Sequence, residues 1–369
     1  MQPTVLKKGS GLDVLAVVPY QLGFQPKDSL VVVALRPPRS QTGMMSRFDL
    51  TPVRQPGVGQ QMARRLLQYI KADGATGAFL IRYAGFKDGP ARHDPAMVSV
   101  VQVLKKGLDQ VVCWDVVGNR IIPLCNGSLE EMEPSFTKQD LAGTRAAATM
   151  ISQGATFQAD RADLAQLPTV DRDKIRLAGR SQRRVLDKVQ TMCGPRLVDW
   201  RLEEIARWRQ WLEHLAKAGP EVDLVTVPAS ELGHMGALLQ DIKGRDAVLA
   251  MMVNEVSGAE IRAAKGGFDK KVLAGLFMPG CSPDTRYLEA APRLLALVAA
   301  HQAQPRRGSA LALMAWFAWW HSDGARAEVL AEAALALPNP PSLAQMVKDL
   351  VYGGTLPQAI RLMKAQRQD

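Results

Sequence analysis

Cysteines and long apolar runs are scarce in this sequence. Its 369 residues include four cysteines, and no two of them form a CxxC pair. A zinc ribbon or a disulfide framework is therefore not expected, and a reducing cytosol fits best. No apolar run reaches the roughly 20 residues that a membrane-spanning helix needs. The longest, ALALMAWFAWW at 310–320, predicts a buried helix, and the polar start MQPTVLKKGSG predicts no signal peptide.

Catalytic signatures are missing as well. The five histidines show no HExxH spacing, and no GxSxG nucleophile motif occurs. Each cysteine is interpreted as buried apolar filling rather than as a nucleophile. We therefore predict no metal site, no bound cofactor and no catalytic constellation.

The charge is one-sided but dispersed. The chain has 46 basic and 36 acidic residues, a net charge of +10 and a pI of about 9.6. Such an excess favours polyanionic partners such as nucleic acid, acidic protein faces or anionic lipid. Because the basic residues are spread along the chain, solubility alone explains the excess equally well.

Residues 1–136 predict an α/β domain. The stretch 12–22 has helical spacing, with Gly23 as a left-handed C-cap and Pro19 expected to kink the helix or end it early. Three strand patterns follow, at 30–35, 46–50 and 77–85, together with helix patterns at 57–74 and 94–107 and a hairpin over 110–124 that turns at Gly118 and Asn119. Strands that alternate with helices of this length are typical of α/β domains.

Residues 137–369 predict an all-α domain, because the strand signals fade there. Long helix patterns cover the regions 172–194 and 199–219, and shorter ones are expected at 230–240, 244–256, 284–302, 309–321, 325–336 and 342–352. The segment 310–340 has the cadence of a tetratricopeptide-like hairpin. Only one clear copy occurs, so we predict one hairpin within a larger helical domain.

A first candidate ligand site lies in the α/β domain. Arg47 and Asp49 fall at i and i+2, on one face of a strand, and Asp28 precedes the neighbouring strand. Such groups could line a pocket at the carboxyl edge of an open sheet. The alternative is that they are ordinary solvated charges.

A second candidate is an anion cradle. Gly57 and Gly59 stand where a loop enters a helix, with Arg64 and Arg65 following in that helix. Backbone N–H groups at a helix N-terminus attract anions. The GK[ST] ending of a Walker loop and the third glycine of a dinucleotide fingerprint are missing, so a flexible loop entering a helix is the competing interpretation.

The strongest electrostatic feature is the segment 171–218. It holds 12 basic and 7 acidic residues, a net charge of +5 and so half of the excess of the whole chain. Spacings of three and four place Arg176, Arg180 and Arg183 or Arg184 along one side of a helix. Such a face would bind nucleic acid through phosphates, without reading sequence. A solvated helix surface is the alternative.

The opening of the chain resembles a known family. The strings DVL at 13–15, VPYQLGF at 18–24 and DSLVV at 28–32 are similar to the start of the actinobacterial family called domain of unknown function 4192. GRDAVLA and the segment 310–338 extend the likeness over nearly the whole chain. Members often have a Cys-Pro or Cys-Cys-Pro segment after the hairpin cysteine; this chain keeps Cys125 but lacks the later ones. The resemblance implies no activity, cofactor or catalytic residue.

These observations lead to three functional hypotheses. A cytosolic, non-enzymatic binding or adaptor protein ranks first, with a protein partner bound through the helical domain. The second is a small-molecule or nucleotide-dependent enzyme that uses the sheet edge of the α/β domain. The third is sequence-independent binding of nucleic acid through the basic helical face.

Overall fold

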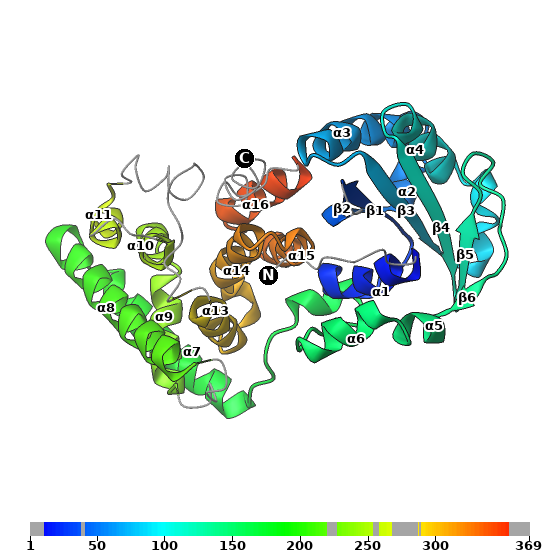
Figure 1. Cartoon of the computed structure of the whole chain (residues 1–369). Helices are drawn as coiled ribbons and strands as arrows, with labels where there is room; N and C mark the ends of the chain where they lie inside the picture. Colours follow the sequence, from blue (N-terminus) through cyan, green and yellow to red (C-terminus); the bar gives the residue numbers. More distant parts are fainter. Residues whose placement is uncertain are drawn as a thin grey trace. The chain divides into compact units, whose positions relative to one another are not determined.

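The computed structural model of the chain describes residues 11–37, 41–219, 227–253, 258–267, 287 and 289–353. Contacts divide the chain into two compact units, Met1–Arg161 and Ala162–Asp369. The first contains a six-stranded mixed sheet, and the described part of the second is helical (Figure 1). This confirms the predicted order of an α/β part followed by an α part.

The first unit mixes helices and strands along the chain. They are α1 (Gly11–Leu22), β1 (Ser29–Arg36), β2 (Gln41–Asp49), α2 (Leu50–Val53), α3 (Val58–Ala72), β3 (Gly77–Ala84), α4 (Pro95–Lys105), β4 (Gln110–Val117), β5 (Arg120–Leu124), β6 (Phe136–Thr137), α5 (Lys138–Ala142) and α6 (Arg145–Ser152). Every strand and helix predicted between 12 and 124 is present. The helix α1 continues through Pro19 and ends before Gly23, whose φ of +77° is the left-handed conformation that glycine favours.

The sheet has the strand order β2-β1-β3-β4-β5-β6. Only β3 and β4 are parallel, and α4 makes the crossover that a parallel pair requires. The strand β1 is antiparallel to both of its neighbours, with Ser29 opposite Tyr83. The beginning of β1 therefore lies at the same end of the sheet as the carboxyl ends of β3 and β4.

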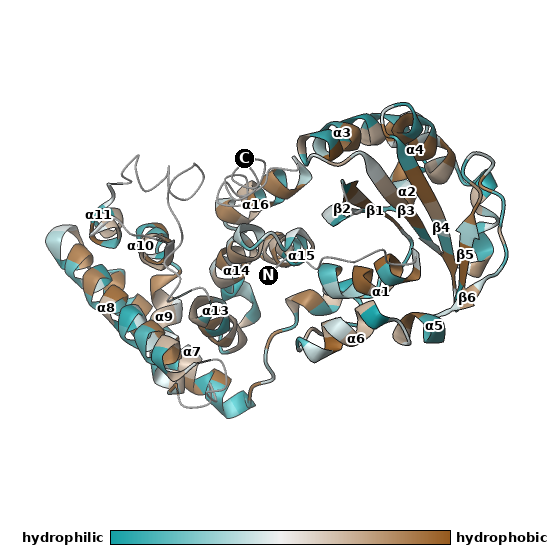
Figure 2. Ribbon diagram, viewed as in Figure 1, coloured by the Kyte–Doolittle hydropathy of each residue, from teal (hydrophilic) through white to brown (hydrophobic). Residues whose placement is uncertain are grey.

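Apolar residues cover both faces of this sheet. Alternate residues of β1 and β3, including Leu30 and Leu80, pack in one core cluster with Leu66 of α3 and Val100 of α4. The helix α1 lies across the other face (Figure 1). Figure 2 shows the strands β3 and β4 coloured hydrophobic along most of their length, as expected for strands buried on both faces.

The described part of the second unit is built from helices. Those described are α7 (Arg172–Val189), α8 (Gly194–Ala218), α9 (Ala229–Leu238), α10 (Ile242–Val253), α11 (Ala259–Lys265), α13 (Ala290–Ala300), α14 (Gly308–Trp320), α15 (Gly324–Leu335) and α16 (Ser342–Tyr352). All the predicted helices are present; the predicted stretches 254–256 and 284–286 lie outside the described residues. The helix α14 is buried on every side and packs against α13, α15 and α16.

The two divisions of the chain differ in where they place α5 and α6. The sequence places the boundary after residue 136, whereas the compact units divide after Arg161. The helix α6 packs against α1 through Ala146 and Met150, which form a small apolar cluster with Val17. The segment 137–161 thus contacts the first unit, and the domain boundary after residue 136 stays a prediction.

Candidate anion-binding groove

The helix α7 has a buried face and a charged face. Its first turn is capped by Asp171, whose carboxylate accepts a hydrogen bond from the Asp173 amide at 2.6 Å. Ala178, Gln182 and Val185 fall at helical spacing and are buried. Basic residues cover much of the remaining surface of the helix, which is why it has a strongly hydrophilic average composition despite its apolar stripe.

Close packing of α9 against α7 forms one wall of a groove. Gly233 makes this approach possible, because a Cβ atom at that position would lie 2.4 Å from the Ala178 carbonyl oxygen. The Ser181 hydroxyl, one turn further along, donates a hydrogen bond to the Ser230 carbonyl at 3.0 Å. The helix α8 forms the other wall.

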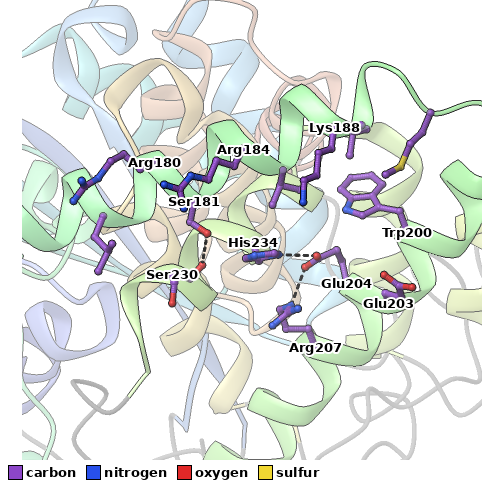
Figure 3. A pocket seen from close by; sticks show the side chains of 14 residues that line it. Arg180, Ser181, Arg184, Lys188, Trp200, Glu203, Glu204, Arg207, Ser230 and His234 are labelled. Carbon is purple, nitrogen blue, oxygen red and sulfur yellow. Dashed lines mark hydrogen bonds and ion pairs between the residues drawn. The ribbon is translucent and has the colours of Figure 1, made fainter.

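The α7–α9 groove has a volume of about 610 Å³, within the range of roughly 300–1,000 Å³ that is usual for small-ligand sites. Figure 3 shows its side chains, which come from α7, α8, α9 and the turn after α7. The lining residues are Leu177, Arg180, Ser181, Arg184, Val185, Lys188, Val189, Met192, Trp200, Glu203, Glu204, Arg207, Ser230 and His234.

Three cations line one wall of the groove at intervals of four residues. Arg180, Arg184 and Lys188 are all exposed. Residues at this spacing project from one side of a helix, about 6 Å apart along its axis. None of the three makes a hydrogen bond or ion pair within the described residues. Their charges are therefore available to a ligand.

A fixed polar cluster lies across from these cations. Glu204 is buried, with one carboxylate oxygen 2.8 Å from the Nδ1 of His234 and the other accepting a hydrogen bond from the Nε of Arg207 at 3.1 Å. Arg207 also donates to Glu231 at 2.5 Å. Burial lowers the pKa of Arg207, but its interactions with Glu231 and Glu204 outweigh this and leave the pKa raised. Figure 3 shows the cluster spanning α8 and α9.

The groove also contains a buried donor without a partner. Trp200 is 6% exposed, and within the described residues its indole Nε1 has no hydrogen-bond acceptor. Figure 3 shows the Trp200 ring towards the end of the groove where Lys188 extends, with Arg180 towards the other end. A buried N–H group without a partner costs about 1–3 kcal/mol, and because the nitrogen atom itself is covered by protein, a ligand in the groove does not reach it in this conformation.

The first unit holds a second charge cluster, in its core. Arg82 of β3 is fully buried and forms a bidentate pair with Asp115 of β4, with distances of 2.9 Å from Nε and 2.6 Å from Nη2. Asp94, which caps α4, accepts from Arg82 at 2.9 Å and from Arg54 at 2.6 Å. Arg54 also pairs with Asp88. This cluster joins the carboxyl ends of the parallel strands to the start of their crossover helix.

The pKa values of the two carboxylates in this cluster, Asp94 and Asp115, are shifted in opposite directions. Burial acts to raise the pKa of Asp94, but hydrogen bonds from Arg54 and Arg82 outweigh it and hold the pKa below its usual value. Burial raises the pKa of Asp115, and its pairing with Arg82 only partly opposes this. Each carboxylate therefore depends on its arginine partners to stay charged inside the core.

A comparison with protein families now places the chain. The model described as "Domain of unknown function (DUF4192)" matches residues 12–358, which span both units. The chain belongs to the DUF4192 family. Neither the curated proteins nor the solved structures provide a match. The function of this DUF4192 protein is therefore argued from its own geometry.

The basic residues predicted on α7 of the DUF4192 chain divide into two pairs. Arg180 and Arg184 line the groove. Arg176 instead pairs with Asp173 at 3.1 Å, and Arg183 donates to the Gly179 carbonyl at 3.4 Å. The sequence predicted that Arg176, Arg180 and Arg183 or Arg184 lie along one side of a helix; Arg180 and Arg184 line the groove, whereas Arg176 and Arg183 are not among its lining residues.

The predicted anion cradle is spread along α3. Gly57 precedes the helix with a φ of +79°, and a Cβ atom there would meet nothing within 4 Å. Gly59 serves packing, because a Cβ atom would lie 2.3 Å from the Ser99 hydroxyl of α4. Arg64 and Arg65 are exposed and lie beyond the first turn. Anion binding here stays a prediction.

The predicted sheet-edge site is organised around an internal pair. Arg47 and Asp49 at the end of β2 form an ion pair at 2.5 Å, and Arg47 lies 5.9 Å from the centre of the Phe24 ring. Asp28 is exposed and has a φ of +44°. Arg47 lies opposite Val31, whereas Arg82 lies opposite Leu30, so Arg47 and the buried cluster are on opposite faces of the sheet. Ligand binding by these residues stays a prediction.

Sequence reasoning missed both polar clusters of the DUF4192 chain. Arg82 and Asp115 each interrupt an otherwise apolar strand, and two opposite charges in neighbouring buried strands are a signal that could have paired them. His234 and Glu204 gave no such signal, because they are 30 residues apart on different helices.

In the described ranges, no group of three or more His, Cys, Asp or Glu side chains could hold a metal ion. No helix there combines the length and the apolar character needed to cross a bilayer. Cys113 is buried, and burial raises its pKa to about 12, whereas Cys125 and Cys193 are exposed; Cys281 lies outside the described residues.

Proposed function

We propose that this protein is a non-enzymatic binding protein whose α7–α9 groove takes a small phosphate-bearing ligand. The observation that carries the proposal is the row Arg180, Arg184 and Lys188, whose charges have no partner within the described residues and which lines a groove of ligand size. The proposal is a form of the binding-protein hypothesis reached from the sequence. The proposal assigns ligand binding to one groove instead of to the whole basic face of the helix.

The chemistry of the groove suits a phosphate group. Guanidinium groups bind phosphate oxygens in a two-pronged geometry, and such charge-assisted hydrogen bonds are stronger than neutral ones. Val185, Val189 and Met192 add an apolar surface for the rest of the ligand. Ligand sites commonly combine an apolar lining with a few placed polar groups.

The test is a calorimetric titration of the full chain with inorganic pyrophosphate. Two double variants of α7 are compared, Arg180→Ala with Arg184→Ala and Arg176→Ala with Arg183→Ala. Both remove two charges from the same helix, so they change net charge and helix propensity equally. The first should weaken binding about tenfold or more, since each lost charged hydrogen bond costs about 1.5–3 kcal/mol when desolvated. The second should leave affinity within about twofold.

Equal weakening by the two double variants would refute the groove. No binding by the unmodified chain would refute the proposal as a whole. A thermal-shift panel of nucleotides and common cofactors runs beside it, because ligand at 100 times its Kd adds roughly 2.7 kcal/mol of stability.

Sequence-independent binding of nucleic acid is the second candidate, and the same row of cations favours it. Arg180, Arg184 and Lys188 continue along the helix and could track successive phosphates. In that case Arg176 and Arg183 would contribute as much as the groove pair. Affinity for single-stranded DNA and RNA, measured at two salt concentrations, decides the matter. A salt slope that falls by about one unit for each arginine removed from either pair supports nucleic acid.

A further inference from the structure

The Glu204–His234 pair determines which hydrogen-bonding role His234 presents to the groove. One oxygen of Glu204 accepts a hydrogen bond from the guanidinium of Arg207, and a carboxylate paired with a guanidinium acts as an acceptor toward its other neighbours. Its other oxygen lies 2.8 Å from the Nδ1 of His234. That nitrogen must therefore carry the proton, and in a neutral imidazole the remaining nitrogen, Nε2, is then an acceptor.

The Nε2 of His234 is open to a ligand. The side chain is 31% exposed and lines the groove, while Glu204, at 5%, is beneath it. Within the described residues Nε2 has no hydrogen-bond partner. The groups that would hold a phosphate, namely Arg180, Arg184 and Lys188, are all donors. His234 therefore offers a neutral acceptor opposite a row of donors.

A phosphate oxygen cannot satisfy this acceptor. At neutral and basic pH phosphate oxygens have lone pairs and few hydrogens, so they would repel the Nε2 lone pair. A hydroxyl group can donate to Nε2. We infer that the ligand of the groove is a hydroxylated phosphate, in which a hydroxyl close to the phosphate donates a hydrogen bond to the Nε2 of His234. This inference rests on the proposed function and names the ligand class of the same site.

The test uses two phosphate monoesters that carry equal charge at pH 8. Glycerol 3-phosphate has two hydroxyls, and propyl phosphate has the same carbon chain with none. Titrations of the full chain, followed by NMR of the histidine Hε1 signals and by calorimetry, should show glycerol 3-phosphate binding about tenfold tighter. A factor of this size corresponds to one hydrogen bond.

Two variants assign the preference to His234. His234→Leu should reduce the affinity ratio to about one, whereas His214→Leu, at an exposed position of α8 outside the groove, should keep it. Glu204→Gln keeps the imidazole but no longer requires a proton on Nδ1, so the ratio should fall while the ring remains. Circular dichroism shows whether each variant folds. If His234→Leu does not fold, Glu204→Gln still tests the inference.

The outcomes separate this inference from the proposed function. An affinity ratio near one at pH 8 in the unmodified chain, or a ratio that survives His234→Leu, overturns the inference and leaves the phosphate site intact. Binding of pyrophosphate with no binding of either monoester also overturns the inference and leaves the phosphate site intact. Failure of all three probes removes both.

Discussion

Removing Arg82 should selectively destabilise the first unit. Arg82 is fully buried and makes hydrogen bonds to Asp115, Asp94 and the Gly89 carbonyl. In an Arg82→Met variant Asp94 keeps Arg54 and the Ala96 amide. Within the described residues the Asp115 carboxylate then keeps no hydrogen bond, and it becomes an uncompensated buried carboxylate. Breaking a buried pair in this way costs about 3–5 kcal/mol.

Hydrogen exchange measured by mass spectrometry can locate this loss. Peptides that cover β3 and β4 should exchange about 10²- to 10³-fold faster, since 1.4 kcal/mol corresponds to a factor of ten. Peptides from α14, which lies in the core of the second unit, serve as the internal control and should not change. A change of less than about tenfold in β3 and β4 would refute the claim that Arg82 stabilises the core.

Two additional measurements distinguish charge from packing. A double variant, Arg82→Met with Asp115→Leu, should recover most of the lost protection, because apolar replacement of a buried pair is often neutral. The loss in Arg82→Met should also shrink between pH 8 and pH 5. Burial already raises the pKa of Asp115, and without Arg82 this carboxyl would bind a proton more readily. If the loss of protection does not depend on pH, the altered packing, rather than the unpaired charge of Asp115, causes it.

The remaining predictions concern packing, acid and the boundary. Gly233→Ala should cost about 1–3 kcal/mol in urea unfolding, because its Cβ atom would lie 2.4 Å from a carbonyl oxygen of α7, whereas Gly179→Ala, with nothing within 4 Å, should be neutral or stabilising. The lowered pKa of Asp94 contributes stability that is present above its unfolded pKa of about 3.9 and is lost as the pH falls through the lower folded value, so an Asp94→Asn variant should show a flatter acid-unfolding curve. Limited proteolysis should cut first within 130–170; first cuts within 30–124, with that region protected, would contradict the domain boundary.

Much of the secondary structure follows from local pattern. The hairpin at Gly118 and Asn119 has a two-residue turn between apolar strands, and β4 and β5 pair as that turn requires. The apolar run of α14 is too short for a membrane and is buried on all sides, as predicted. The pairing of the strands was harder to predict from the sequence. Nothing local in the sequence specifies that β1 lies between β2 and β3, because both contacts depend on residues distant along the chain.

The candidate groove likewise contains some residues that local sequence pattern predicts and others that it does not. Arg180 and Arg184 were predicted from charge and helical spacing, and both line the groove. Spacing could not separate them from Arg176 and Arg183, because the side of α7 that faces α8 is set by the contact of Gly233 with α7. His234 and Glu204 meet only through tertiary packing. The tetratricopeptide-like character of the α14–α15 pair stays a prediction.

The burial of α14 has a consequence for biosynthesis. Its buried surface includes four aromatic side chains, Trp316, Phe317, Trp319 and Trp320, and its partners α15 and α16 follow it in the chain. A ribosome therefore releases α14 before the residues that cover it, such as Leu330 and Val347. Until about residue 350 has emerged from the ribosome, the apolar surface of α14 is not fully covered. The strands of the first unit have already been synthesised by then and can fold. Slow translation or truncation between 320 and 347 should therefore leave the aromatic surface of α14 exposed and favour aggregation through it.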